Sequence, residues 1–198
     1  KIIYSSYHTP GEGEHKILQN IKNTTENNKP VVIYGLDADL IFLSISSNKN
    51  NIYLLREKEQ FNNYTNCNGD INNNFTYVSI DITKEAINTI FREQLYNNDT
   101  CFCKDFVFIC YLLGNDFLPH LPSIDIKING MDIVLNTYIK CYKKIKSCLV
   151  NIINNKIILN NNFLVNFLND LGSLEYNFFT ESLWKYLEKH NRKKCFES

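Results

Sequence analysis

A strand, a helix and a second strand follow one another within about 25 residues near the start of this 198-residue chain. Pro30 precedes the apolar run 31–34 and Gly35 ends it, which is typical of a short buried strand. The apolar run 40–43 predicts the start of a helix, and 52–55 predicts the next strand. Because parallel strands need a crossover helix of this kind, the pattern predicts a parallel α/β unit.

Hydrophobic periodicity predicts further helices and strands along the chain. Thr83 suits the N-cap of a helix that follows a strand ending at Ile82. The apolar stretch 105–113 predicts a buried element that stops at Gly114, before two prolines. The other predicted elements are a helix from Glu12, a strand over 77–82, helices over 83–96 and 129–145, a hairpin over 150–159 turning at Asn154 and Asn155, and helices over 161–171 and 173–190.

The composition limits the classes of protein that this chain can represent. It has 21 Lys and Arg against 21 Asp and Glu, so a zero net charge removes the argument for a broadly basic, nucleic-acid-binding surface. No apolar run is long enough to span a membrane, and no signal-peptide pattern opens the chain. The seven cysteines lack zinc-ligand spacing, so we expect reduced thiols. These features predict an intracellular protein without a membrane partner, and leave cytoplasm and nucleus open.

Five acidic residues lie where apolar elements begin or end beside glycine: Glu12, Glu14, Asp37, Asp39 and Asp116. In an open α/β sheet the carboxyl ends of the strands gather at one edge, where sites form. Carboxylates that converge there repel one another unless a cation joins them. Hard oxygen ligands suit Mg²⁺ or Mn²⁺, and two such ions can promote the hydrolysis of a phosphodiester. The pattern therefore favours metal-dependent phosphodiester cleavage.

The same five residues also have a simpler interpretation. Asp or Glu at a helix start is commonly a cap or a dipole partner, and Asp in a Gly-Asn-Asp turn commonly stabilises the turn. Glu-x-Glu and Asp-x-Asp are weak signals individually. Spacing alone does not show that the five carboxylates converge.

Longer strings around these residues are more specific. In order they are Pro-Gly-Glu-Gly-Glu-His-Lys-Ile at 10–17, Tyr-Gly-Leu-Asp-Ala-Asp-Leu-Ile at 34–41 and Gly-Asn-Asp-Phe-Leu-Pro-His-Leu-Pro at 114–122. Together they resemble the signature of the XRN-type 5′→3′ exoribonucleases. The strings at 53–57 and 105–108 also look like their family counterparts.

The resemblance implies an α/β nuclease core of the PIN and flap-endonuclease type, with a central, largely parallel sheet flanked by helices, followed by a helical C-terminal part. The family uses divalent metal, Mg²⁺ or Mn²⁺, with two ions expected, to degrade single-stranded RNA that bears a 5′ monophosphate. It works processively, releases nucleoside 5′-monophosphates, and acts in RNA decay and processing. By motif position, the catalytic, metal-binding residues implied here are Glu12, Glu14, Asp37, Asp39 and Asp116.

The resemblance also implies a division of the chain. Residues 1–148 are expected to belong to the nuclease core, with an Asn-rich surface insertion at 57–75, and residues 149–198 to add a hairpin and helices of the same conserved region. The chain begins at Lys1 and its single methionine is Met131, so we expect an internal piece. The family's further aspartates and its basic 5′-phosphate pocket would lie upstream. We therefore expect the isolated chain to have little or no exonuclease activity.

Two other functions remain open from the sequence. One is a structure-specific flap or PIN-like endonuclease, which could act on DNA, and the other is a non-catalytic, RNA-binding remnant of the fold. Protein partners and oligomeric state are not indicated. The basic runs 140–146 and 190–194 could contact an RNA backbone, although most such runs are solvated helix faces or ends.

Overall fold

The chain divides into two compact units, residues 1–89 and 90–198, in this computed structural model. The predicted insertion at 57–75 falls almost wholly on residues 58–74, outside the described part. Among the described residues, no helix is both long and apolar enough to cross a membrane. The described residues are 2–23, 29–35, 37, 39–57, 75–97, 102–115, 118–154, 156–181, 184–185 and 187–188.

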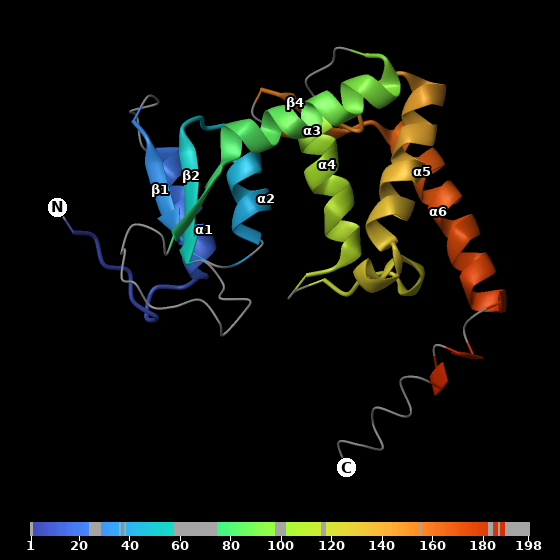
Figure 1. Cartoon of the computed structure of the whole chain (residues 1–198), viewed down its shortest axis with the longest axis horizontal. Coiled ribbons are helices and arrows are strands. Elements are labelled where there is room, and N and C mark those ends of the chain that lie inside the picture. Colours follow the sequence, from blue (N-terminus) through green and yellow to red (C-terminus); the bar gives the residue numbers. More distant parts are fainter. Residues whose placement is uncertain are drawn as a thin grey trace, which may run out of the picture. The chain divides into compact units, whose positions relative to one another are not determined.

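The first unit is built on a three-stranded sheet with the order β1-β2-β3 (Figure 1). β1 and β2 run parallel with α2 between them in the chain, which confirms the predicted strand–helix–strand unit. β3 pairs antiparallel with β2, so the described sheet is small and mixed, and of the expected central, largely parallel sheet it contains one parallel pair, β1 and β2. An antiparallel neighbour needs no crossover helix, and the Asn-rich connection before β3 has no helical periodicity. The strands are β1 (Val31–Tyr34), β2 (Ile52–Glu57) and β3 (Phe75–Ser79).

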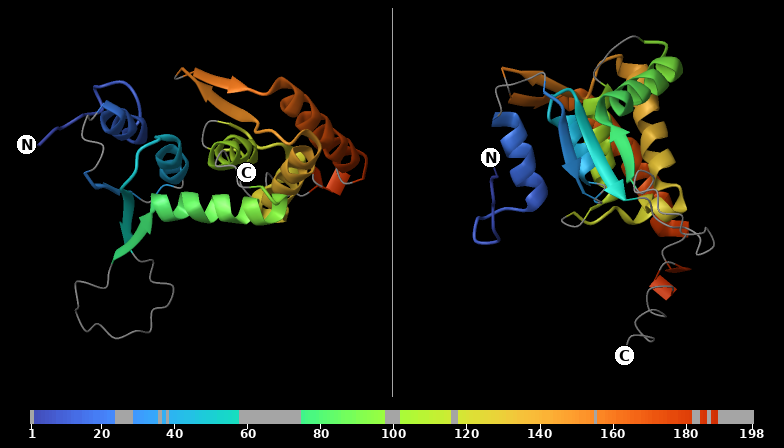
Figure 2. Two further views of the ribbon diagram at one scale, coloured as in Figure 1. Left: turned by 90° about the horizontal axis from the view of Figure 1, so that it is seen from above. Right: turned by 60° about the vertical axis from the view of Figure 1, so that its left-hand side comes forward.

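Helices α1 (Gly13–Asn23) and α2 (Asp39–Ser46) pack against each other, and Figure 2 shows both on one side of the sheet. On the covered face, Ile33 of β1 and its partner Leu54 of β2 are buried. On the opposite face, Val32 and Tyr34 are 56% and 58% exposed. β1 is therefore half-buried and not the buried strand that its apolar run predicts.

Helix α3 (Ile80–Leu95) begins three residues before the predicted Thr83 cap, and the unit boundary falls within it. The Ser79 hydroxyl accepts a hydrogen bond from the backbone N–H of Ile82 at 3.4 Å, as an N-cap does. The Thr83 hydroxyl instead donates to the Ser79 carbonyl at 2.9 Å, from inside the first helical turn. Ser79 is thus the cap, and the predicted strand ends there.

The second unit encloses an aromatic core between its helices. Tyr138, Phe102, Phe163 and Phe167 are all fully buried. The ring of Phe91 from α3 lies 5.4 Å from the rings of both Phe102 and Tyr138. Burying such large side chains is the main stabilising contribution here. The four fully buried rings come from α4 (Phe102–Cys110), α5 (Gly130–Ile145) and α6 (Asn161–Glu181). The same unit contains the short 3₁₀ helices η2 (Tyr111–Leu113), η3 (Pro122–Ile124) and η4 (Ile126–Ile128).

The hairpin of this unit matches its prediction, but the helix after it does not. Strands β4 (Val150–Ile153) and β5 (Lys156–Leu159) pair antiparallel, and Asn154 between them has a positive φ of 51°. One continuous helix, α6, replaces the two predicted helices that part at Gly172. Phe163, Phe167 and Leu171 form a buried stripe along it, which outweighs the weak helix preference of glycine.

Cysteines occur in two states in the second unit. Cys103, Cys110 and Cys141 are free and buried, as the expectation of reduced thiols requires. Cys148 is disulfide-bonded, so that expectation is wrong for this residue.

Candidate metal-binding site

Glu12 and Glu14 stand at the N-terminal end of α1. Gly11 before them has a φ of +98°, which glycine adopts without steric cost. The Glu12 carbonyl accepts a 3.1 Å hydrogen bond from the Lys16 N–H, and this bond opens the helix. The Glu12 carboxylate is exposed and lies 3.7 Å from Nδ1 of His15, whereas Glu14 is half-buried. The partial positive charge of a helix N-terminus favours both carboxylates here.

Asp37 and Asp39 occupy the matching position at the start of α2. Oδ1 of Asp37 accepts a 3.1 Å hydrogen bond from the backbone N–H of Asp39, the first residue of the helix. This is the capping role of the simpler interpretation, and it uses one of the two oxygens of Asp37. At Gly35 a Cβ would come within 2.3 Å of Cδ1 of Leu40, so a larger residue there would force the end of the Leu40 side chain to move.

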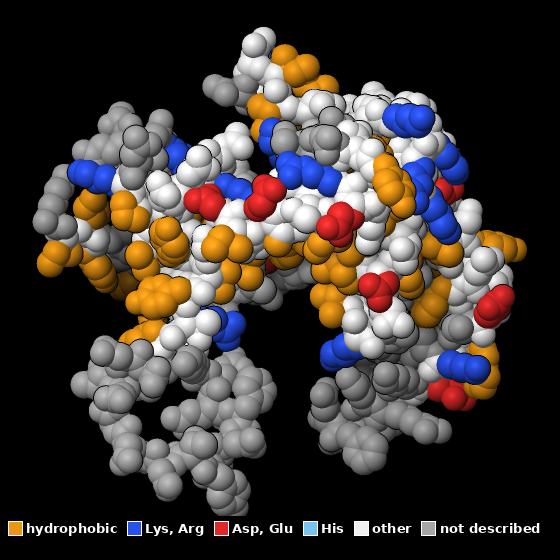
Figure 3. Space-filling view, turned by 45° about the horizontal axis from the view of Figure 1, so that its top comes forward, with side chains coloured by type: hydrophobic (Ala, Val, Ile, Leu, Met, Phe, Trp, Pro, Cys, Tyr) orange, Lys and Arg blue, Asp and Glu red, His pale blue; other side chains and the backbone are white. Residues whose placement is uncertain are grey.

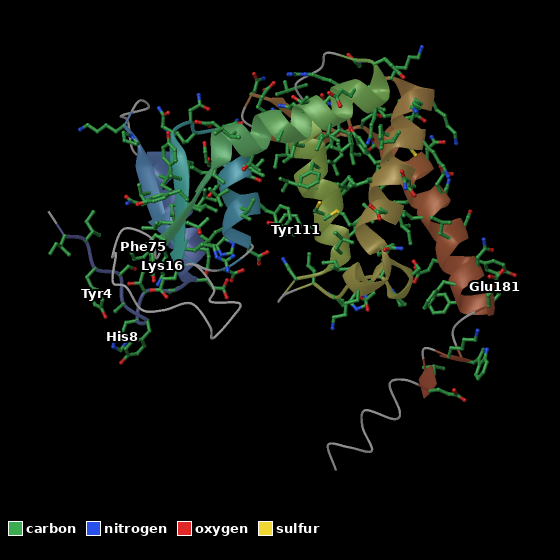
Figure 4. The ribbon with its side chains drawn as sticks, viewed as in Figure 1. Tyr4, His8, Lys16, Phe75, Tyr111 and Glu181 are labelled. Carbon is green, nitrogen blue, oxygen red and sulfur yellow. The ribbon has the colours of Figure 1, made fainter. Side chains whose placement is uncertain are left out.

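The two acidic pairs lie at the same end of the first unit. α1 and α2 pack side by side, and both begin at the end where the parallel strands β1 and β2 finish (Figure 1). Lys16, one turn into α1, is labelled at this end in Figure 4, and its Nζ donates a 3.2 Å hydrogen bond to the Ser6 carbonyl. The structure therefore brings these four carboxylates to the carboxyl edge of the parallel pair, where α/β sites form.

The donor chemistry at this edge suits a hard divalent cation, since it consists of carboxylate oxygens. Within the part of the chain that the structure describes, however, no group of three or more His, Cys, Asp or Glu side chains is placed to hold a metal ion. The described carboxylates thus offer suitable ligands without forming a complete site by themselves.

The third motif belongs to the second unit, and Asp116 lies outside the described residues. On either side of it, the Asn115 side chain accepts a 2.8 Å hydrogen bond from the Leu118 N–H. Gly114 has a φ of +82°, and a Cβ there would come within 2.7 Å of the backbone nitrogen of His120. The motif glycine is therefore required by the backbone. That Asp116 binds metal together with the other four carboxylates remains a prediction.

Sequence reasoning gave Asp105 no role of its own. Its side chain is fully buried, and its carboxylate accepts hydrogen bonds from the Tyr138 hydroxyl at 2.6 Å and from the N–H groups of Leu149 and Val150 at 2.8 and 2.7 Å. Burial raises the pKa of this carboxyl, while the three hydrogen bonds oppose the rise. The available signal for such a buried structural group was an aspartate at the start of the apolar stretch 105–113.

Comparison with known protein families covers both units. The family model "XRN 5'-3' exonuclease N-terminus" matches residues 1–58, and the family model "Xrn1 helical domain" matches residues 96–197, more than half of the chain. The chain belongs to the XRN family. The first match contains the two acidic pairs, and the second contains the Gly-Asn-Asp motif and the aromatic core of the second unit.

Individual XRN relatives agree with this assignment. A 5'-3' exoribonuclease 2 of Debaryomyces hansenii is 31% identical over 74% of this chain and 17% of its own length. The protein of the same name from Saccharomyces cerevisiae is 29% identical over 100% of this chain and 22% of its own length. That of Arabidopsis thaliana is 29% identical over 90% of this chain and 21% of its own length. The chain thus spans about a fifth of the length of these three relatives.

Proposed function

We propose that this chain contributes metal-binding carboxylates to a 5′→3′ exoribonuclease that hydrolyses single-stranded RNA bearing a 5′ monophosphate. The products would be nucleoside 5′-monophosphates, released processively during RNA decay or processing inside the cell. The observation that supports this proposal most is the placement of the two acidic pairs. They lie at the starts of two adjacent helices, at the carboxyl edge of a parallel strand pair, in a member of the XRN family.

The proposed roles follow from the chemistry of these side chains. Glu12, Glu14, Asp37, Asp39 and Asp116 would hold two Mg²⁺ or Mn²⁺ ions. When bound, such ions supply an activated water and neutralise charge on the scissile phosphate. The start of α2 orients Asp37 through its hydrogen bond to the Asp39 N–H, so one oxygen is fixed by the helix. In this proposal residues 1–148 belong to the nuclease core and residues 149–198 form its extension.

A chimera tests the proposal, because the chain corresponds to only 22% of the S. cerevisiae exoribonuclease 2 that it matches over its whole length. The matching segment of that enzyme is replaced by this chain. We expect the chimera to release mononucleotides from 5′-phosphorylated RNA in Mg²⁺ and to spare 5′-hydroxyl RNA. Asp37→Asn and Asp39→Asn should each lower the rate by at least about 100-fold, since even residues that only support metal ligands cost about 10–100-fold.

The matched controls are Glu93→Gln and Asp132→Asn, which neutralise exposed carboxylates outside the motifs and should leave the rate unchanged. Each variant is first shown to unfold with the same midpoint as the parent chimera. Full activity in a folded variant that lacks both Asp37 and Asp39 carboxylates contradicts the proposal. Internal cleavage of the RNA would favour the endonuclease alternative, and binding without hydrolysis would favour the RNA-binding remnant.

A further inference from the structure

Four lysines gather at the C-terminal end of α5, on a chain whose net charge is zero. Lys140, Lys143, Lys144 and Lys146, here named the lysine cluster, are all exposed. Figure 3 shows Lys and Arg side chains gathering at the upper right of that view, over the second unit. The excess of positive charge is therefore local and does not reflect the composition of the whole chain.

Few acidic side chains balance this charge. Residues three and four apart are neighbours on a helix, so Lys140, Lys143 and Lys144 share one face and repel one another. Nζ of Lys144 lies 3.6 Å from the Asp170 carboxylate. Lys140, Lys143 and Lys146 form no ion pair with any described acidic residue. The cluster keeps a surplus of positive charge that a polyanion could neutralise.

The helix end itself does not account for four lysines. Cations in the last turn stabilise the negative end of the helix dipole, which explains Lys143 and Lys144. Lys140 lies a turn earlier. Lys146 follows the helix in a left-handed conformation with a φ of 53°, and its N–H already donates to the Tyr142 carbonyl at 2.7 Å. Lys140 and Lys146 therefore add charge beyond what the dipole attracts.

The helix that carries the cluster is firmly anchored. On its inner side Tyr138, Cys141 and Tyr142 are buried, and the Tyr142 hydroxyl accepts a 2.6 Å hydrogen bond from the Asn97 side chain. The rise of 1.5 Å per residue puts the backbones of Lys140 and Lys144 about 6 Å apart along the axis. The buried contacts therefore hold the helix that presents these lysines to the solvent.

We propose that the lysine cluster binds the phosphodiester backbone of single-stranded RNA, independently of base sequence, of a 5′ phosphate and of divalent metal. The choice of RNA rests on the proposed function, because an exoribonuclease of this family acts on RNA. The cluster then provides a contact with the substrate strand that is separate from the five motif carboxylates. Binding of this kind is electrostatic, is driven by the release of counterions from the strand, and weakens as the salt concentration rises.

Fluorescence anisotropy of the full chain with a labelled 5′-hydroxyl oligouridylate in EDTA tests this site. Lys140→Gln/Lys143→Gln/Lys146→Gln should weaken binding about 10–100-fold at about 50 mM salt, and reduce the slope of log K against log salt by about 2, at 0.7 per lost contact. The matched control, Lys127→Gln/Lys156→Gln/Lys185→Gln, removes the same charge from exposed positions outside the cluster. It should change affinity by less than about twofold.

Three results overturn the proposal. The first is that the cluster variant binds RNA as tightly as the parent chain does. The second is that the control variant loses as much RNA affinity as the cluster variant. The third is that polyglutamate binds more tightly than the oligouridylate, which would indicate an acidic protein partner. Circular dichroism confirms that both variants fold, which is expected because every substituted side chain is exposed. EDTA and a 5′-hydroxyl RNA exclude hydrolysis, so this experiment measures binding alone. The lysine-cluster proposal can therefore be wrong while the nuclease proposal is right, and the nuclease proposal can be wrong while this one is right.

Discussion

The hydroxyl of Tyr138 donates a 2.6 Å hydrogen bond to the carboxylate of Asp105, and both side chains are fully buried. The same carboxylate accepts from the N–H groups of Leu149 and Val150, where β4 begins. One side chain of α4 therefore joins α5 to the start of the hairpin. Such a buried charge is tolerated because three donors replace the water it has lost.

Replacing Asp105 should destabilise the second unit strongly. Asp105→Ala leaves two backbone N–H groups and the Tyr138 hydroxyl without an acceptor, at about 1–3 kcal/mol for each buried unsatisfied group. We expect the free energy of unfolding, measured by urea denaturation, to fall by at least about 3 kcal/mol. Tyr138→Phe removes a single donor and should cost about 1.5–3 kcal/mol. Equal stability of Asp105→Ala and the parent chain would contradict this account.

The Asp105 carboxyl should also make stability depend on pH. Burial raises its pKa above the ordinary value of 3.8, so the folded chain binds this proton more tightly than the unfolded chain does. The free energy of unfolding then falls as pH rises from about 4 through the raised pKa. Asp105→Asn cannot titrate, so the stability of the parent relative to this variant should shrink over that range. Urea denaturation at several pH values measures the difference, and a difference that grows with pH would be the opposite sign.

Local patterns predicted the elements whose stability is mostly local. The strand–helix–strand arrangement of β1, α2 and β2 was predictable because each element has its own hydrophobic pattern along the sequence. The hairpin was predictable because asparagine tolerates the positive φ that Asn154 adopts. The antiparallel direction of β3 and the exposure of Tyr34 depend on which elements pack against one another. The hydrophobic pattern of a single element does not carry this information.

In the candidate site, too, local features were predictable from the sequence and long-range contacts were not. Glycine and acidic spacing placed Glu14 and Asp39 at helix starts, where the structure has them. The contact of Asp105 with Leu149 joins residues 44 apart in the chain, and no spacing rule predicts it. A convergence of Asp116 with Asp37 would also join residues far apart in the chain, and it remains a prediction.

Two glycines should respond oppositely to alanine. Gly172 lies inside α6 with open space where a Cβ would be added, so Gly172→Ala should stabilise the chain by about 0.5–1 kcal/mol. Gly114 has a φ of +82°, and a Cβ there meets the backbone nitrogen of His120 at 2.7 Å, so Gly114→Ala should cost about 1–3 kcal/mol. Thermal unfolding of the two variants measures both effects. Gly13→Ala, also with open space, serves as the control for a motif glycine that the backbone does not require.

Two buried thiols should resist alkylation until the chain unfolds. Burial raises the pKa of Cys110 to about 12 and that of Cys141 to about 11, where the nearby Asp170 adds to the effect. Because the thiolate is the nucleophile, iodoacetamide at pH about 8 should modify both at least about 100-fold more slowly in the folded chain than in urea. Peptide mass spectrometry follows each cysteine separately. Rapid labelling of Cys141 alone under native conditions would show that α5 and α6 separate there, since Cys141 is fully buried beside Asp170 of α6.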